Sequence, residues 1–278
     1  MYPNIAAYET LNQNSTVYKS LAGQLHAFHK ISFDEGFENV NIRLAAMIAY
    51  LDVAKELVFS REKITSYGDS LYKQWKSKNP NVFLQAKKYA LTTSKHVIHW
   101  MNQDNYKETR TMPEYNILSD DPSKWEPTPP AYMEAIEPHW NKIRAFALDS
   151  ASQFKPIPPP QFSMDKRSLF YKELIDVYTV NMGIRQKGDA SEEIAIAQFW
   201  DCNPYVSINK GHFMFAAKKI TPGAHWIGIC KIACKQIQSS FEGIYSVFEL
   251  IYIILTFIFL EKIQLKSLKV KSVKGNLI

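Results

Sequence analysis

The chain has 278 residues, of which 46% are hydrophobic and 22% charged, and its formal net charge is +6 at pH 7. These proportions are those of a globular protein with enough chain to bury a core. The positive charge comes mainly from lysine, and no segment concentrates arginine with aromatic residues. The charge therefore indicates a solvated lysine surface and argues against a nucleic-acid partner.

The chain begins directly with a helical pattern. Pro3 stands at a favourable first-turn position, and Ile5, Tyr8 and Leu11 follow it at helical spacing. No basic segment followed by an apolar run is present, so no secretory signal is visible. The sequence leaves the compartment open.

Three further helices are predicted in the N-terminal region, which we place at residues 1–104. Apolar residues recur every three or four positions in the segments 39–59, 60–77 and 81–103. An Asn-Pro step at 79–80 separates the last two, because proline lacks an amide donor and disfavours helix in the residue before it.

Residues 105–162 are predicted to form a long ordered connection without long helices. Ten prolines interrupt the stretch from 105 to 163, and tryptophan, tyrosine and phenylalanine lie between them. A disordered linker has few aromatic residues, so we expect this segment to pack over the helical core. Trp125 and Trp140 should be substantially buried.

Helices are predicted to resume in the region 163–247. Ser163 is the expected N-cap of the first, Asp189 and Glu192 have capping-box spacing before the second, and a Thr-Pro step at 221–222 begins the last. The residues expected to face inward on the first of these helices are Leu169, Leu174, Ile175, Val177 and Tyr178. Since no period-two alternation, internal repeat or phosphate-binding glycine loop occurs, the predicted fold class is all-α, a helical bundle with a long proline- and aromatic-rich loop.

The segment FELIYIILTFIFLEK, residues 248–262, differs from everything before it. Residues 243–260 are almost uniformly apolar, with Glu249 the only charge, and a lysine-rich tail completes the region 248–278. Three interpretations are open: a membrane anchor, a buried core helix, or an interruption of the coding sequence. An anchor needs about 18–20 apolar residues, which 243–260 barely supplies.

Histidine and cysteine offer the only patterns that suggest a metal site. His26 with His29, and His96 with His99, would share a helix face, but neither pair has a carboxylate at a ligand-like offset. The three cysteines are Cys202, Cys230 and Cys234, and the last two are one helical turn apart near His225 without the paired spacing of a zinc module. Satisfied histidines and small core cysteines are the preferred interpretation, so no metal site is predicted.

Four segments occur in an order that resembles a known family. They are DPSKWEPTPPAYMEAIEPHW at 121–140, IPPPQFS at 157–163, IRQKGDASEEIAIAQFW at 184–200 and GHFMFAAKKITPGAHWIGICKIA at 211–233. Together they resemble helical bacterial proteins related to vanadium-dependent haloperoxidases and type 2 phosphatidic acid phosphatases. The similarity covers roughly residues 2 to 242.

The resemblance implies an anion site that these residues do not supply. In the family, lysine, arginine and backbone amides hold vanadate or a phosphoryl group beside a histidine, in Arg-Pro and Ser-Gly-His motifs. This chain contains neither motif. Gly211-His212 follows Asn-Lys and precedes the PGAHW segment, and His225 within that segment matches a position outside the family's anion cage. We therefore assign no catalytic, cofactor-binding or metal residue to this chain.

The resemblance also favours one interpretation of the apolar segment. In the family a longer helix would continue towards the Arg-Pro motif, whereas this sequence departs from that plan at about Glu249. We expect a truncated haloperoxidase-like or phosphatase-related protein that is inactive and holds no vanadate or phosphate, with relatives that are exported. The alternative is a non-catalytic helical scaffold held at a membrane by 243–260, and apolar surface left exposed predicts self-association.

Overall fold

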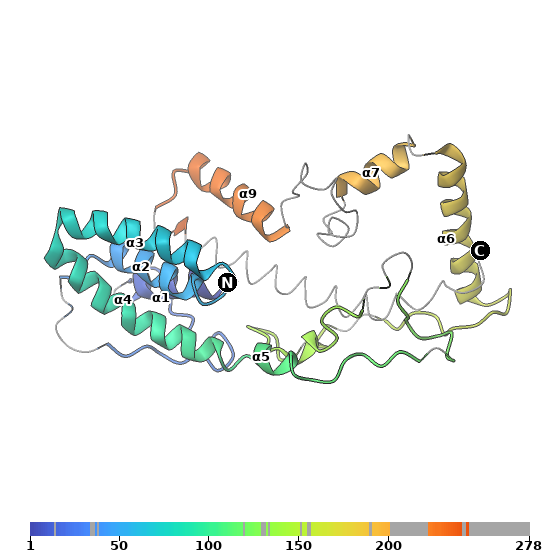
Figure 1. Ribbon diagram of the computed structural model, residues 1–278, viewed down its shortest axis with the longest axis horizontal. Coiled ribbons are helices and arrows are strands. Elements are labelled where there is room, and N and C mark those ends of the chain that lie inside the picture. The colour runs from blue at the N-terminus through green and yellow to red at the C-terminus, as the bar shows by residue number, and fades with distance from the viewer. Residues whose placement is uncertain are drawn as a thin grey trace. The chain divides into compact units, whose positions relative to one another are not determined.

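The computed structural model describes 1–13, 15–33, 37, 39–118, 120–128, 132, 134–150, 152–154, 157–188, 191–200, 222–240 and 243–244 (Figure 1). These residues form helices and irregular segments and contain no β-strand, which confirms the predicted all-α fold class. Predictions that concern Asp189, Cys202, His212 and the apolar segment from 248 onward fall outside the described residues.

The chain divides into two compact units, which we describe separately. The first comprises Met1–Met112, His139–Gln153 and Trp226–Leu260, and the second Pro113–Pro138, Phe154–His225 and Glu261–Ile278. The helices of the first unit are α1 (Tyr2–Asn12), α2 (Ile42–Ala54), α3 (Arg61–Lys78), α4 (Pro80–Met101), α5 (Tyr106–Thr109), the 3-10 helix η1 (Trp140–Lys142) and most of α9 (Pro222–Gln236). Those of the second are α6 (Leu169–Lys187) and α7 (Glu192–Trp200).

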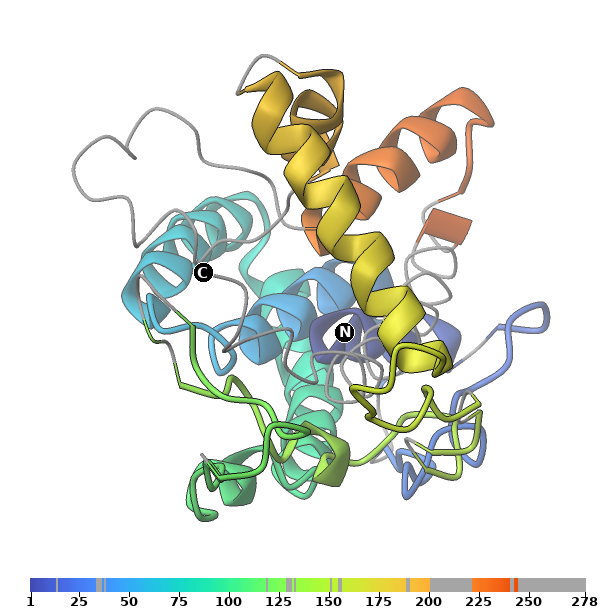
Figure 2. The same cartoon turned by 90° about the vertical axis from the view of Figure 1, so that its right-hand side faces the viewer.

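The core of the first unit lies between α1, α2 and α4. The helix α2 packs against both of the others, and α3 packs against α4, as the grouped blue to teal ribbons of Figures 1 and 2 show. Fully buried alanines lie on α1 and α2, which pack against each other, and small side chains of this kind let two helix backbones approach closely. These alanines are Ala6, Ala7, Ala45, Ala46 and Ala49. Larger apolar side chains such as Ile5, Ile48 and Phe83 fill the space beside them.

The helix boundaries in this unit follow from local capping. Asn79 ends α3 and caps α4, where its side-chain oxygen accepts a hydrogen bond from the Val82 amide at 3.2 Å and Pro80 occupies the first turn. The helix predicted at 39–59 is shorter, because the side chain of Asn41 accepts from the Leu44 amide at 3.0 Å and fixes the start of α2 at Ile42. The predicted break at 79–80 is confirmed.

Local predictions for the second unit need correction. The N-cap of α6 is Ser168, whose hydroxyl accepts from the Tyr171 amide at 3.1 Å, whereas Ser163 accepts from the Asp165 amide in a preceding turn. The helix α7 begins at Glu192, so its cap is Ser191, which accepts from the Ile194 amide at 3.3 Å. In each case the serine directly before the first helical residue accepts the capping hydrogen bond.

The apolar residues of α6 are also more exposed than predicted. Leu169 is 61% exposed, Val177 58% and Ile175 37%, so the prediction that these three face inward is wrong. Leu174 and Tyr178 are half-buried. An apolar helix face that is exposed to this extent is unusual for an isolated unit and is the kind of surface that other polypeptide segments cover.

The proline-rich connection is mostly irregular, as predicted. Its described residues contain only α5 and η1 as regular elements. Trp125 and Trp140, predicted to be substantially buried, are half-buried, and the ring of Trp125 meets Tyr115 of the same unit with centroids 5.6 Å apart. Phe146 packs against the core of the first unit, so part of the segment does lie on the helices.

Among the described residues, none of the helices combines the length and the apolar character that crossing a membrane requires.

Candidate functional site

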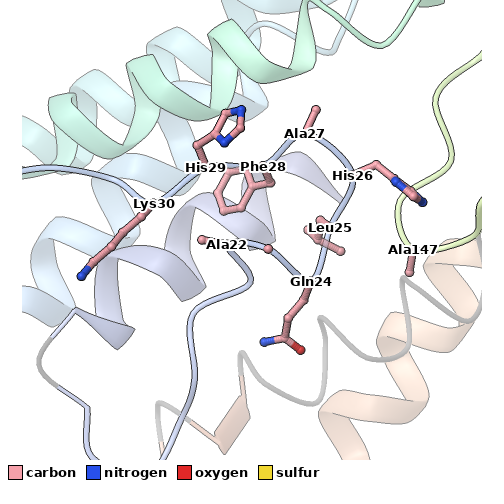
Figure 3. Close-up of a pocket in the computed structure, with 10 residues that line it drawn as sticks. Ala22, Gln24, Leu25, His26, Ala27, Phe28, His29, Lys30 and Ala147 are labelled. Carbon is pink, nitrogen blue, oxygen red and sulfur yellow. The ribbon is translucent and has the colours of Figure 1, made fainter.

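The loop 20–30 packs against α4, with the Trp100 indole donating to the His26 carbonyl, and lines a pocket. Loop residues 22–30 and Ala147 surround an open depression of about 530 Å³ (Figure 3). Its polar side chains are Gln24, His26, His29 and Lys30, and Figure 3 shows His26, Gln24 and Lys30 pointing away from one another. Side chains that diverge cannot surround a small ligand, so the depression has no convergent set of binding groups.

The histidines do not form the paired sites that their spacing suggested. His96 and His99 lie on α4. His26 and His29 lie in the loop, so the expectation that His26 and His29 share a helix face is wrong. The ring of His96 hydrogen-bonds to the backbone of His29 and meets the edge of Phe28 with centroids 5.4 Å apart. Within the described ranges, no group of three or more histidine, cysteine or acidic side chains could hold a metal ion.

The environment of His96 disfavours its charged form. Burial lowers the pKa of His96 below the ordinary 6.5, and the neighbouring His29 and His99 act in the same direction, while the hydrogen bond to the His29 backbone opposes them. The unfolded chain therefore takes up a proton at this position more readily than the folded protein does. Stability from this group is complete above pH 6.5 and is lost as the pH falls below that value.

We accordingly expect the stability of the wild type relative to His96→Gln to be greater at pH 7.5 than at pH 5.5. Urea unfolding followed by circular dichroism at the two pH values measures it. His225→Gln on the exposed start of α9 is the control and should keep the wild-type dependence. A difference between the wild type and His96→Gln that is equal at the two pH values would show that the packing around this ring does not control its protonation.

A buried carboxylate holds the beginning of the same loop. Glu9 on α1 is fully buried, and its two carboxylate oxygens accept hydrogen bonds from the Leu21 amide at 2.6 Å and the Ser20 hydroxyl at 2.8 Å. Burial raises the pKa of Glu9, and the two hydrogen bonds oppose this effect. Because both bonds go to the protein's own loop, this carboxylate positions the chain rather than a ligand.

A second polar cluster joins the start of α1 to the end of α4. The Tyr2 hydroxyl donates to the Asp104 carboxylate at 2.5 Å, and the Tyr106 amide donates to the other oxygen at 2.8 Å. Arg144 lies over the Trp100 ring at 4.3 Å and donates to the Trp100 carbonyl at 2.9 Å. Burial raises the pKa of Tyr2, with the hydrogen bond to Asp104 adding to it, so this phenol stays protonated.

The cysteines of α9 behave as core residues. Cys230 and Cys234 are both buried free thiols, as the preferred interpretation of their spacing predicts. Burial raises the pKa of Cys230, and the proximity of Cys234 adds to the shift. A thiol that resists ionisation is a poor nucleophile and a poor metal ligand. His225, at the start of the same helix, is exposed.

Sequence reasoning missed Glu9 and the cluster of Tyr2, Asp104 and Arg144. The partners in the cluster are far apart along the chain: 102 residues separate Tyr2 from Asp104. The one local signal is the Asp104 side chain bonded to the amide two residues later, a common turn motif that does not specify a site.

Comparison with known proteins identifies a solved structure that is similar to this chain. No protein-family model and no curated protein matches the chain. The crystal structure of a bacterial vanadium-dependent iodoperoxidase is similar, with a TM-score of 0.84 and 48% sequence identity over 94% of this chain and 60% of that chain. This chain thus spans about 60% of the length of the iodoperoxidase. The resemblance predicted from the sequence motifs is confirmed: the chain has the fold of the vanadium-dependent haloperoxidase-related proteins.

Proposed function

We propose that this chain is the helical scaffold part of a vanadium haloperoxidase-like protein and that it has no peroxidase activity by itself. The observation that supports the first statement is 48% identity to a vanadium-dependent iodoperoxidase over 94% of the chain. The second rests on the sequence, which contains neither the Arg-Pro nor the Ser-Gly-His motif that the anion site of the family requires.

The placement of positive charge among the described residues supports the proposal that this chain holds no vanadate. An oxyanion with dispersed charge needs several cationic donors aimed at one point. Here three of the arginines bond to separate local partners: Arg61 to Glu56, Arg144 to the Trp100 carbonyl and Arg167 to Asp165. The depression beside loop 20–30 has Lys30 as its single lysine or arginine. These separate placements support the proposal that the described part of the chain forms no cage for a pentacoordinate anion.

The purified chain should show no vanadate-dependent oxidation of iodide by hydrogen peroxide and no hydrolysis of a phosphate monoester. Loss of one preorganised oxyanion donor reduces a rate by roughly 10²–10³, and here the whole set is missing. The assay follows triiodide formation with and without added vanadate, and the bacterial iodoperoxidase is the positive control. Vanadate-dependent turnover that disappears in His212→Ala or His225→Ala would refute the proposal, whereas turnover that survives both changes would identify a contaminant.

The similar iodoperoxidase favours halide and peroxide over phosphate esters as the substrates of the complete fold. A link to type 2 phosphatidic acid phosphatases remains a prediction from the sequence motifs. Membrane attachment through 243–260 remains a prediction as well, since only 243–244 of that segment are described. Sedimentation of the chain with lipid vesicles, compared with residues 1–242, tests it.

A further inference from the structure

The positive charge of the chain is concentrated on the hairpin of α3 and α4, which pack against each other in the first unit (Figure 1). Residues 70–103 contain six lysines and neither aspartate nor glutamate. Because the formal net charge of the whole chain is +6, the rest of the chain is neutral by formal charge. The six, all of them exposed, are Lys73, Lys76, Lys78, Lys87, Lys88 and Lys95. The net charge is thus a property of this hairpin.

The protein's own carboxylates do not neutralise these lysines. Within the described part of the chain none of the six forms an ion pair, whereas Lys55 and Arg61, which precede the segment, are both paired with carboxylates. Lys87 lies over the ring of Tyr72 on α3, with its ammonium nitrogen 5.4 Å from the ring centroid, so the positive surface of α4 adjoins α3. An aromatic ring attracts a cation without neutralising its charge, which leaves the hairpin open to an anionic partner.

Two exposed leucines alternate with lysines on the outer face of α4. Leu84, Lys88, Leu91 and Lys95 stand at positions i, i+4, i+7 and i+11, and therefore lie in one stripe along the helix. Leu84 is 53% exposed and Leu91 45%. The opposite face of α4 supplies buried residues to the core and packs against α1 and α2, so this packing fixes the rotation of the helix and keeps the stripe outward.

We propose that the α4 stripe, with the lysines beside it, binds the surface of a lipid bilayer that contains anionic lipids. The lysines complement the negative head groups, and the two leucines enter the boundary between head groups and acyl chains. A soluble polyanion offers no apolar layer for these leucines, and the absence of arginine from residues 70–103 disfavours a nucleic acid. The contact is independent of the proposed function, because it neither requires nor excludes peroxidase activity.

Sedimentation of the full 278-residue chain with lipid vesicles tests the proposal. Binding to vesicles of phosphatidylcholine with about one-third phosphatidylglycerol should be at least about tenfold stronger than binding to phosphatidylcholine alone. It should weaken as the salt concentration rises from about 0.05 M to 0.5 M, because salt screens the attraction.

Two charge-reversal variants locate the contact. Lys88→Glu with Lys95→Glu should weaken binding to the anionic vesicles at least about tenfold. The matched control is Lys231→Glu with Lys235→Glu on α9, which changes the charge of the chain equally at two exposed helical positions. The control should bind within about threefold of the wild type. Equal binding by the two variants, or binding that does not depend on lipid charge, would overturn the proposal.

The leucines distinguish a bilayer from a soluble acidic partner. Leu84→Ser with Leu91→Ser should weaken vesicle binding at least about threefold, because less apolar surface is removed from water. The same variant should bind soluble polyglutamate as the wild type does. Far-UV circular dichroism establishes that every variant is folded. A wild-type chain that binds polyglutamate but not the anionic vesicles would overturn the proposal in favour of an acidic polypeptide, and full vesicle binding by the leucine variant would contradict insertion.

Discussion

Replacing Trp100 by alanine is expected to lower the free energy of unfolding by about 3–5 kcal/mol. Trp100 is 2% exposed, and its ring meets the rings of Tyr2, Phe28 and Phe146 with centroids 5.3, 4.8 and 5.5 Å apart. Its indole nitrogen also donates to the His26 carbonyl at 2.9 Å. The substitution thus removes a large buried ring and leaves a carbonyl without its partner.

Urea unfolding followed by circular dichroism measures the loss. Trp100→Phe should cost less than Trp100→Ala, because it retains much of the ring packing and loses the hydrogen bond. Leu84→Ala on the exposed side of α4 is the control and should change stability by no more than about 0.5 kcal/mol. A Trp100→Ala cost as small as that of the control would mean that α1, the loop and residue 146 do not depend on this ring.

The sequence predicted the elements whose ends depend on neighbouring residues. The break between α3 and α4 at Asn79-Pro80 is a local effect of proline and of the capping side chain of Asn79, and α9 begins at Pro222. The cap of α6 was misplaced because Ser163 and Ser168 are equally good caps by type, and only the turn around Asp165 decides between them. Burial on α6 could not be predicted, since periodicity shows a face but not what covers it.

The candidate site was harder to predict than the fold. Two histidines three residues apart lie on a helix in the case of His96 and His99, but in a loop in the case of His26 and His29. The spacing alone therefore does not show whether a pair of histidines shares a helix face. The contact that gives His96 its environment comes from His29, a residue distant in sequence. The motifs were more informative than single residues because four segments in one fixed order make a specific pattern, and the similarity to the iodoperoxidase covers 94% of the chain.

Replacing Glu9 by alanine should lower the free energy of unfolding by about 1–3 kcal/mol, chiefly because the buried Leu21 amide loses its acceptor. That amide bonds to the Glu9 carboxylate at 2.6 Å, and the Ser20 hydroxyl bonds to the other oxygen at 2.8 Å. Glu9→Gln keeps an acceptor for the amide and removes the charge, so it should cost less than Glu9→Ala at neutral pH.

The pH dependence separates the charge of Glu9 from its hydrogen bonds. Burial raises the pKa of Glu9 above 4.5, so the folded protein holds this proton more tightly than the unfolded chain does. Stability from this group is therefore present below pH 4.5 and is lost as the pH rises through the folded pKa. Urea unfolding at pH 4.5 and 8 should show that the stability of the wild type relative to Glu9→Gln is greater at pH 4.5 than at pH 8, because the contribution of His96 is the same in both proteins and cancels. Glu62→Gln, on the exposed first turn of α3, is the control and should keep the wild-type pH dependence. A difference between the wild type and Glu9→Gln that is the same at both pH values would mean that Glu9 holds the loop equally well with or without its proton.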